Sequence, residues 1–408
     1  MLALALLMSL SGPACRASAD IADGPTSADR TLAQLLQNRF PTAGLGPGGG
    51  GQVVDIASGR TVWASDGGTG RMPASTAKLA DAVTALTVLG PDHRERTLTR
   101  YDQGTVYLVG GGDQQLSRDD LAALAGATAT ALDQRGLPVT ALRVDDSLFP
   151  APTPSPGWES GYYPHDLAPV RALALCGARL NDTAVAAGEL FAKQLAGAGV
   201  TLGTAPVTRA VTPVSALGLA TRWSRPLSDS VEYMLKVSDN NIAEGLLRLS
   251  ALARQRAATW QGGTAVIREV LTGYGIPLDG VDLFDGSGLS RRDRLTPAAL
   301  TALVSLAVDT RARAGNPLWP LFQGLPIAGR DGTLAARLHR FSSRPSSCAA
   351  GRVHAKTGTL HDAVALAGVT RGRDGRWKAF AFVENGPPVP RRARMGLDRL
   401  AATVAGCW

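Results

Sequence analysis

The chain has 408 residues, a formal net charge of +8 and a pI near 9.7, and 45% of its residues are hydrophobic. This length predicts more than one folded domain. The basic charge suits an anionic partner, but the arginines are scattered and aromatic residues make up only 5% of the chain, so we do not expect a nucleic-acid partner.

The first residues resemble an export signal. Residues 2–10 are apolar and uncharged, and Ala17-Ser18-Ala19 is a small-residue cleavage pattern, although no positive segment precedes the apolar run. We therefore expect a signal peptide over residues 1–19 and an exported, extracytoplasmic protein. A lipid anchor at Cys15 is disfavoured, because no large aliphatic residue stands in Gly12-Pro13-Ala14 before it. No other stretch approaches the roughly 20 apolar residues of a membrane span, so none is expected in the mature chain.

The next segments predict a strand and then a helix. Residues 52–62 read as a strand, and the glycines at 48–51 before them read as a turn or linker. The run Leu79, Ala80, Val83, Leu86, Leu89 has helical spacing and places Ser75 near the helix start. Ser75 and Lys78 are three residues apart and share a helix face, so a neutral Lys78 can take the proton of the serine hydroxyl. Alone, such a pair is common on solvated helices.

A long segment separates this helix from the next helical pattern. Between Lys78 and Ser238 lie 159 residues, with strand-like runs at 104–109 and 139–144, a proline-rich stretch at 150–156 and an amphipathic helix at 183–195. Helical patterning resumes near Pro226. We therefore predict a discontinuous catalytic domain over residues 32–94 and 220–408, with one or two inserted domains over 95–219.

Two further motifs follow in the second part of the chain. Val237-Ser238-Asp239-Asn240-Asn241 comes after a helical stretch, and Lys356-Thr357-Gly358-Thr359 precedes an apolar run and reads as the start of an edge strand. Only five of the 42 basic residues are lysines, and two of them stand in the motifs. Lysine can lose its proton near neutral pH when it is desolvated, whereas arginine cannot, which indicates proton transfer.

The order S-x-x-K, S-x-N, K-T-G is that of serine penicillin-binding proteins and serine β-lactamases. The chain resembles the class C low-molecular-mass penicillin-binding proteins, the D-alanyl-D-alanine carboxypeptidase/endopeptidase family of serine peptidases. The resemblance extends over about residues 53–385 and includes the stretches 110–113, 145–149, 285–290 and 331–334. It implies an α/β catalytic domain, with an antiparallel sheet covered by helices as in penicillin-binding proteins and β-lactamases, and smaller β-containing insert domains.

The resemblance also implies a role for each motif residue. Ser75 attacks a carbonyl carbon, Lys78 accepts its proton, and the charge of Lys356 keeps Lys78 neutral. Ser238 relays the proton to the leaving amine, and Asn240 binds a substrate amide. The backbone N–H groups of Ser75 and Thr359 form the oxyanion hole, Lys356 with Thr357 binds the substrate carboxylate, and Gly358 lets the substrate backbone approach.

Other residues carry weaker signals. Lys193, Lys236 and Lys378 read as surface charges, and the five histidines lack metal-ligand spacing, so neither a metal nor a cofactor is expected. By resemblance, Trp158 or Tyr162 contacts the stem-peptide side chain; the alternative is a hydrophobic insert core. After signal cleavage Cys176, Cys348 and Cys407 remain; Cys348 and Cys407 are the favoured disulfide pair, since both fall in the predicted catalytic domain, and three buried thiols are the alternative.

The sequence thus favours a D-Ala-D-Ala carboxypeptidase or endopeptidase that acts on peptidoglycan peptides through an acyl-Ser75 intermediate. It would be acylated covalently by β-lactam antibiotics, and its basic charge suits an anionic cell wall. One alternative is a serine β-lactamase, although no E-x-x-L-N segment of the class A kind stands between Ser238 and Lys356. The other is a non-catalytic wall-binding protein, which would have no need of Lys78.

Overall fold

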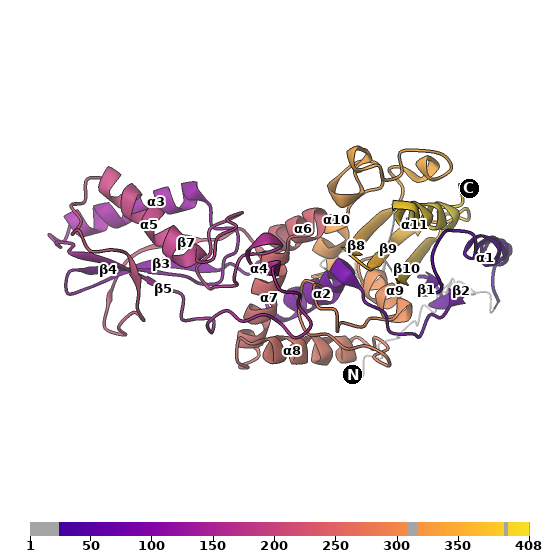
Figure 1. The fold of residues 1–408 in the computed structure, drawn as a ribbon, viewed down its shortest axis with the longest axis horizontal. Coiled ribbons are helices and arrows are strands. Elements are labelled where there is room, and N and C mark those ends of the chain that lie inside the picture. Colours follow the sequence, from indigo (N-terminus) through magenta and orange to yellow (C-terminus); the bar gives the residue numbers. More distant parts are fainter. Residues whose placement is uncertain (1–23, 309–315, 387–390, 408) are drawn as a thin grey trace, which may run out of the picture.

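A computed structural model describes residues 24–308, 316–386 and 391–407. The predicted signal peptide and Cys15 lie outside these residues. Figure 1 shows an elongated molecule in which a smaller α/β body, built from β3 to β7 with α3 and α5, extends from a larger one. The larger body holds the segments on either side of this insert.

The larger body is built on a five-stranded sheet in which every neighbouring pair of strands is antiparallel. Its order is β2-β1-β10-β9-β8, so the first two strands of the chain lie beside the last three. The strands are β1 (Gly49–Asp55), β2 (Arg60–Ser65), β8 (His354–Leu360), β9 (Ala363–Arg371) and β10 (Trp377–Asn385). β8 lies at one edge, as expected for the strand that carries the K-T-G motif.

Helices cover both faces of this sheet. They are α1 (Ser27–Arg39), α2 (Lys78–Val88), α6 (Leu227–Val237), α7 (Asn240–Ala253), α8 (Trp260–Gly273), α9 (Pro297–Leu306), α10 (Trp319–Gly324) and α11 (Arg391–Val404). A 3₁₀ turn, η1 (Ala74–Ala77), leads into α2, and three others stand between α10 and β8: η3 (Gly332–Leu334), η4 (Ala336–Leu338) and η5 (Ser346–Ala349).

The apolar runs in β9 and β10 follow from this double cover. Side chains alternate between the faces of a strand, so a strand buried on both faces has no polar positions in its middle. Ala365, Ala367, Ala379 and Ala381 pack in the core with α2 and the helices α6 to α9. On the other face, larger side chains such as Leu366, Phe380 and Phe382 pack against α1 and α11.

The insert has a five-stranded sheet of its own, in the order β6-β5-β4-β3-β7. Its elements are β3 (Arg96–Asp102), β4 (Thr105–Val109), α3 (Arg118–Asp133), β5 (Ala141–Asp145), α4 (Tyr162–His165), α5 (Thr183–Gly197), β6 (Thr208–Arg209) and β7 (Leu217–Trp223). Apolar side chains of β4 and β5 pack against α3 and α5 in a separate core, whereas α4 contributes Tyr162 to the core of the larger body.

The structure differs from two of the predicted domain boundaries, the end of the insert and the start of the first catalytic segment. β7 pairs with β3 and completes the insert sheet, so the insert ends near Ser224 and not at residue 219. The chain enters and leaves the insert at adjacent points, where Ser224 Oγ donates to Glu95 Oε2 at 2.5 Å. The first catalytic segment begins at Ser27 rather than at residue 32, because Thr26 and Asp29 form a capping box at the start of α1.

The first predicted strand is a hairpin. Residues 52–62 span the end of β1, a turn and the start of β2. The glycine run before it is not a linker either, since Gly49, Gly50 and Gly51 lie inside β1. A Cβ at Gly50 would lie 2.6 Å from the Arg71 guanidinium carbon, and one at Gly51 would lie 2.6 Å from the Phe382 ring. Close packing therefore requires glycine within the strand.

Lys378 is a buried ion-pair centre and not the surface charge that we predicted. Its side chain is 1% exposed, and its Nζ donates to carboxylates of Asp29, Asp55 (2.7 Å) and Asp374 (3.1 Å). The three residues come from α1, from β1 and from the turn before β10, so only folding gathers them. Burial, the largest single effect, opposes ionisation of Asp29 and Asp55, but hydrogen bonds from Lys378 and from Thr26 or Ser58, together with the Lys378 charge, outweigh it and lower their pKa values.

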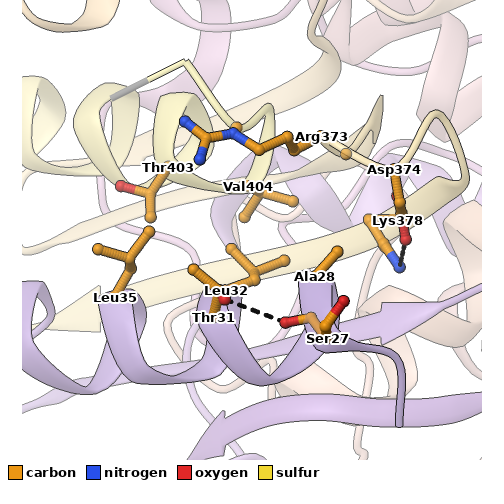
Figure 2. A pocket seen from close by; sticks show the side chains of 12 residues that line it. Ser27, Ala28, Thr31, Leu32, Leu35, Arg373, Asp374, Lys378, Thr403 and Val404 are labelled. Carbon is orange, nitrogen blue, oxygen red and sulfur yellow. Dashed lines mark hydrogen bonds and ion pairs between the residues drawn. The ribbon is translucent and has the colours of Figure 1, made fainter.

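Figure 2 shows Lys378 and Asp374 at one end of a cavity of about 260 Å³ between α1, the β9–β10 turn and α11. Lys378 donates to all three carboxylates of the acidic group Asp29, Asp55 and Asp374, and Arg376 pairs with Asp55 as well. The cavity lies on the α1–α11 face of the sheet, away from the face that α2 covers.

Lys378→Met should lower the free energy of unfolding of the catalytic domain by about 3–5 kcal/mol, because it removes the cation paired with the buried Asp29 carboxylate and leaves Asp55 with Arg376 alone. Urea denaturation at neutral pH measures this loss. Lys193→Met is the matched control, since Lys193 is exposed in α5. The difference should shrink as the pH falls, because the carboxylates contribute stability above their unfolded pKa and lose it as the pH passes down through the lowered folded pKa. Equal stability of the two variants at neutral pH would contradict the ion-pair role.

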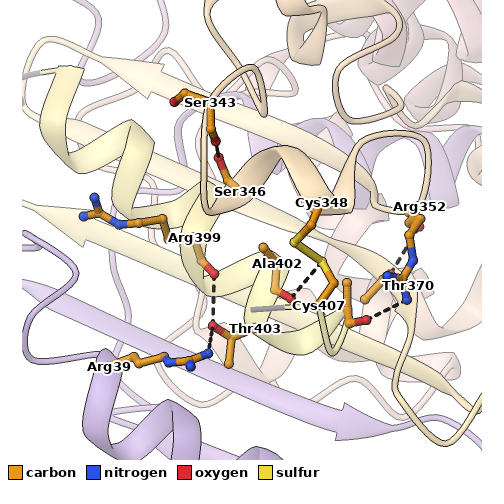
Figure 3. Close-up of a disulfide and its surroundings, with 11 residues drawn as sticks. Arg39, Ser343, Ser346, Cys348, Arg352, Thr370, Arg399, Ala402, Thr403 and Cys407 are labelled. Atoms are coloured by element: carbon orange, nitrogen blue, oxygen red, sulfur yellow. Dashed lines mark hydrogen bonds between the residues drawn. A yellow bond between two sulfur atoms is a disulfide. The ribbon is translucent and has the colours of Figure 1, made fainter.

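A disulfide joins Cys348 to Cys407, as predicted, and Cys176 is an exposed free thiol. Figure 3 shows the bridge between η5 and the end of α11. It closes a loop with a sequence separation of 59 residues that contains β8, β9 and β10. The bridge therefore ties the last helix to the segment that leads into the K-T-G strand.

Candidate active site

Ser75 lies in η1, the 3₁₀ turn that leads directly into α2. The residue before it, Ala74, has a φ of 46°, a left-handed conformation that is uncommon for a residue with a Cβ. Ala74 is fully buried, so packing holds this turn in place. Such backbone conformations cluster at functional sites, where they aim a side chain. Here the turn leaves Ser75 half-buried at the start of the helix, with Lys78 fully buried beneath it.

Lys78 Nζ has three hydrogen-bond acceptors. They are Ser75 Oγ at 2.9 Å, Asn240 Oδ1 at 2.8 Å and the Ser287 carbonyl oxygen at 2.6 Å. The Ser287 carbonyl can only accept, and Asn240 is oriented as an acceptor because its Nδ2 donates to the Asp166 carbonyl at 3.0 Å. A neutral lysine has two N–H groups and one lone pair. With both N–H groups committed to these acceptors, its lone pair remains for the Ser75 hydroxyl.

The second serine lies at the junction of α6 and α7. Ser238 ends α6 with a φ of 64°, and Asp239 begins α7 by accepting a hydrogen bond from Ile242 N at 2.9 Å. This sharp junction turns Ser238 towards β8, where Lys356 Nζ donates to its Oγ at 2.9 Å. Lys356 is fully buried and also donates to the Thr357 carbonyl at 2.9 Å. The structure thus forms two serine–lysine pairs from four separate elements.

Burial disfavours the ammonium form of both lysines. It lowers the pKa of Lys78 to about 8, although the negative charges of Glu244, Asp285 and Asp239 oppose the shift. Burial, followed by repulsion from Lys78, lowers the pKa of Lys356 well below its usual value. We expected the charge of Lys356 to keep Lys78 neutral. Burial is instead the main cause at Lys78, and the repulsion between the two falls on Lys356.

β8, which carries the K-T-G motif, packs directly against η1, the turn that carries Ser75. A Cβ at Gly358 would lie 2.4 Å from the Pro73 carbonyl oxygen and 3.1 Å from the Ala74 Cβ. Glycine is therefore required here so that β8 can approach η1, whereas we had assigned it to approach by the substrate. Thr359 follows on the exposed edge of the sheet. This packing brings the backbone of Ser75 and Thr359, the two predicted oxyanion donors, to adjoining elements.

The η3 turn, which the sequence linked to the site only by resemblance, lies beside Thr357 of β8. Thr357 Oγ1 donates to Thr333 Oγ1 at 2.7 Å, and Lys236 Nζ donates to Asp331 Oδ2 at 2.9 Å. Lys236 also donates to the Leu325 carbonyl, and its side chain is only 18% exposed. It is therefore a structural ion pair and not the free surface charge that we predicted. It anchors the η3 turn beside Thr357 rather than contacting either serine.

Trp158 and Tyr162 are packed in the core of the larger body. Trp158 packs edge-on against Trp260 of α8, with ring centroids 5.1 Å apart, and Tyr162 is 9% exposed. The Trp158 indole N–H donates to Oδ2 of Asp285 at 2.6 Å. Asp285 lies two residues before Ser287, whose carbonyl accepts from Lys78. This placement gives Trp158 a role in holding the 285–290 loop. Tyr162 is a core residue, but of the larger body and not of the insert as the alternative had it.

Ser287 is the site residue that sequence reasoning missed. Its backbone carbonyl binds Lys78, and a backbone carbonyl leaves no mark in a sequence. The signal available was the D-G-S-G turn itself. There Asp285 accepts from Gly288 N and Ser290 N, both at 2.7 Å, and a Cβ at Gly288 would lie 2.0 Å from the Ala74 carbonyl oxygen. The turn is therefore packed against η1, which carries Ser75.

A central antiparallel sheet with helices on both faces, carrying two serine–lysine pairs and an edge-strand K-T-G motif, defines a serine enzyme of the penicillin-binding class. The expected fold class is confirmed, since the structure of penicillin binding protein 4 (dacB) from Haemophilus influenzae superposes with a TM-score of 0.76. That match covers 92% of this chain and 99% of the other at 22% identity.

The chain belongs to the D-Ala-D-Ala carboxypeptidase 3 (S13) family, whose model matches residues 32–178 and 174–404. It is 34% identical to carboxypeptidase DacB of Mycolicibacterium smegmatis, over 94% of this chain and 85% of the relative. It is 30% identical to a D-alanyl-D-alanine carboxypeptidase of Actinomadura sp. strain R39, over 87% of this chain and 81% of the relative. The predicted family and enzyme class are thereby confirmed.

Proposed function

We propose that the protein hydrolyses the terminal D-Ala-D-Ala bond of peptidoglycan stem peptides through an acyl-Ser75 intermediate, and that β-lactams acylate the same serine. The observation that carries this proposal is the set of acceptors around Lys78. Two of them hold the amine so that its lone pair faces the Ser75 hydroxyl. General-base removal of that proton activates the nucleophile.

In the first step, Ser75 Oγ attacks the carbonyl carbon of the penultimate D-Ala and its proton passes to Lys78 Nζ. The backbone N–H groups of Ser75 and Thr359 stabilise the negative charge that develops on the carbonyl oxygen, and each such donor is typically worth about 2.7–4 kcal/mol. The amide bond then breaks, and the leaving amine takes a proton relayed through Ser238. Water hydrolyses the acyl-enzyme and regenerates Ser75.

Lys356 couples substrate binding to this chemistry. A substrate carboxylate beside Lys356 and Thr357 favours the ammonium form of Lys356. Repulsion between two neighbouring ammonium groups then favours loss of the proton from Lys78. The base thus becomes neutral when a substrate with a terminal carboxylate is bound. Asn240 orients Lys78 through its carboxamide, in addition to the substrate-amide contact that we assign to it.

The site of action is proposed to be extracytoplasmic, since the substrate is part of the cell wall and the first residues resemble a signal peptide. Within residues 24–308, 316–386 and 391–407, no helix is long and apolar enough to cross a membrane. The contact of Trp158 or Tyr162 with the stem-peptide side chain remains a prediction, and the packing of Trp158 against Asp285 supports a positioning role for it.

One experiment separates the three functions considered from the sequence. The protein is mixed with a fluorescent penicillin, unbound label is removed, and the adduct is followed over time together with D-alanine release from a D-Ala-D-Ala peptide. We expect a long-lived adduct and D-alanine release. An adduct that decays within seconds, without release of D-alanine, would identify a β-lactamase. Absence of both would identify a non-catalytic binding protein.

A further inference from the structure

Glu244 is a buried carboxylate close to the serine–lysine pairs that takes no part in the steps above. It lies in α7 four residues after Asn240, so both side chains project from the same face of the helix. Its side chain is fully buried. Removing a carboxylate from water costs several kcal/mol, so Glu244 requires strong partners.

Those partners belong to the loop that holds Lys78. Ser287 N donates to Glu244 Oε1 at 2.9 Å, and Gly286 N donates to Oε2 at 3.2 Å. Both carboxylate oxygens therefore accept hydrogen bonds, which suits the ionised form. Ser287 is held on both sides of its Cα, because its N–H donates to Glu244 and its carbonyl, in the following peptide unit, accepts from Lys78 Nζ at 2.6 Å. The backbone of Ser287 thus connects Glu244 to Lys78.

A second buried carboxyl group beside the same loop has no such partners. Asp81 lies in α2 three residues after Lys78, is fully buried, and neither of its oxygens has a hydrogen-bond partner in the described part of the chain. A Cβ at Gly286 would lie 3.3 Å from Asp81 Oδ1, so Asp81 packs against the loop that Glu244 binds. Without a donor, a buried carboxyl group is more stable as the neutral acid, and burial raises the pKa of Asp81 well above its usual value.

We propose that Glu244 is a positioning residue for the general base: it holds the Ser287 carbonyl against Lys78 Nζ, and its negative charge controls how readily Lys78 gives up its proton. Asp81 contributes no charge, because its carboxyl group is protonated. The proposal deepens the proposed function and rests on it, since it assumes that Lys78 is the base for Ser75. Glu244 contacts neither Ser75 nor Ser238. It therefore acts on Lys78 through the loop at 285–290 and through the electrostatic field of its charge.

The charged and titratable groups that face Glu244 or Lys78 come from several elements. They are Arg248 of α7, Asp81 of α2, Tyr163 of α4, Asp285 and Asp293 of the loop before α9, Asp239 at the start of α7, and Lys356 of β8. Burial, with repulsion from Asp285, raises the pKa of Glu244 to about 7. Glu244 is therefore ionised in the range where Lys78, with a pKa of about 8, begins to lose its proton.

The sign of the effect follows directly. A negative charge near an ammonium group favours the charged form, so Glu244 raises the pKa of Lys78 against the larger lowering by burial. Removing that charge should lower the pKa of Lys78. The base would then become neutral at a lower pH, and acylation of Ser75 would begin at a lower pH.

The test is the pH profile of the second-order rate constant for acylation by a fluorescent penicillin, measured from about pH 6 to about pH 10. For Glu244→Gln we expect the midpoint of the rising limb to move down by about one pH unit, the size typical of one close buried charge. The plateau rate should fall, since glutamine offers one acceptor oxygen to two N–H groups. A purely structural loss would lower the plateau and leave the midpoint unchanged.

Two variants separate charge from shape. Glu244→Asp keeps the charge and shortens the side chain, so its midpoint should stay near that of the parent while its plateau falls. Asp81→Asn is the matched control, a change of a buried carboxyl group beside the same loop that removes no charge if Asp81 is neutral. Its midpoint should also stay near that of the parent.

Three outcomes overturn the proposal: an unmoved midpoint in Glu244→Gln, a midpoint lowered in Asp81→Asn, or a midpoint lowered in Glu244→Asp. The last two remain decisive if Glu244→Gln does not fold. Failure of the proposed function has a different signature, because the parent itself would then form no adduct at any pH.

Discussion

Ser75→Ala should yield a folded protein that forms no covalent adduct with penicillin. The serine side chain makes no capping hydrogen bond in η1, and its one described contact is the hydrogen bond from Lys78 Nζ. Loss of such a bond costs about 1 kcal/mol, so the melting temperature should change little. The reaction, by contrast, loses the atom that becomes acylated. Fluorescent labelling and intact-protein mass after incubation with penicillin measure the effect.

Ser27→Ala is a suitable control, because Ser27 also lies at a helix start but on the opposite face of the central sheet, and it should label like the parent. Digestion of the labelled parent should place the adduct on the peptide that contains Ser75. Recovery of an adduct from Ser75→Ala that maps to Ser238 would reverse the roles of the two serines.

Lys78→Arg should slow acylation by penicillin by about 10²–10⁴, the usual contribution of general-base catalysis. Arginine keeps the positive charge but stays protonated at every working pH, so it has no lone pair for the Ser75 proton. Because Lys78 is fully buried, the larger guanidinium should also cost about 1–3 kcal/mol of stability through overpacking. Acylation rates are therefore compared per folded molecule, measured by stopped-flow or timed labelling at pH 8.

Lys356→Arg is the paired comparison. Arginine can still bind a carboxylate and can still repel a charge on Lys78, so this variant should lose less activity than Lys78→Arg. Lys193→Arg, on the surface of the insert, should react like the parent. The proton-transfer argument is wrong if Lys78→Arg acylates as fast as the parent, or if Lys356→Arg is the more damaging change.

The geometry also explains why lysine and not arginine stands at both motif positions. Each Nζ lies in a fully buried site with a serine hydroxyl within 2.9 Å. Burial lowers the pKa of both lysines, and arginine would stay protonated in such a site whereas lysine can alternate between its charged and neutral forms. The other buried lysine, Lys378, has the opposite surroundings, since three carboxylates favour its charged form.

The parts of the site that the sequence predicts are those made by residues close together in the chain. Ser75 and Lys78 are three residues apart on one helical face, and Ser238, Asn240 and Lys356 stand in short motifs whose residue types are dictated by proton transfer. The K-T-G motif predicts the start of an edge strand for the same local reason, and β8 lies at the edge of the sheet. The pairing of Ser75 with Lys78 therefore follows from local spacing and residue chemistry, whereas the family and the fold class follow from the resemblance that the three motifs carry.

Tertiary structure alone decided the features that depend on partners distant in the chain. Lys378 reads as a surface charge until α1, β1 and the β9–β10 turn bring Asp29, Asp55 and Asp374 around it. Residues 220–223 were predicted to begin the second catalytic segment, but they belong to β7, which pairs with β3 in the insert. Ser287 acts through its backbone carbonyl, and Glu244 and Asp81 differ only in whether N–H donors meet their carboxyl groups. Burial and hydrogen-bond partners set the charge of a group, and both are properties of the folded chain rather than of its residue types.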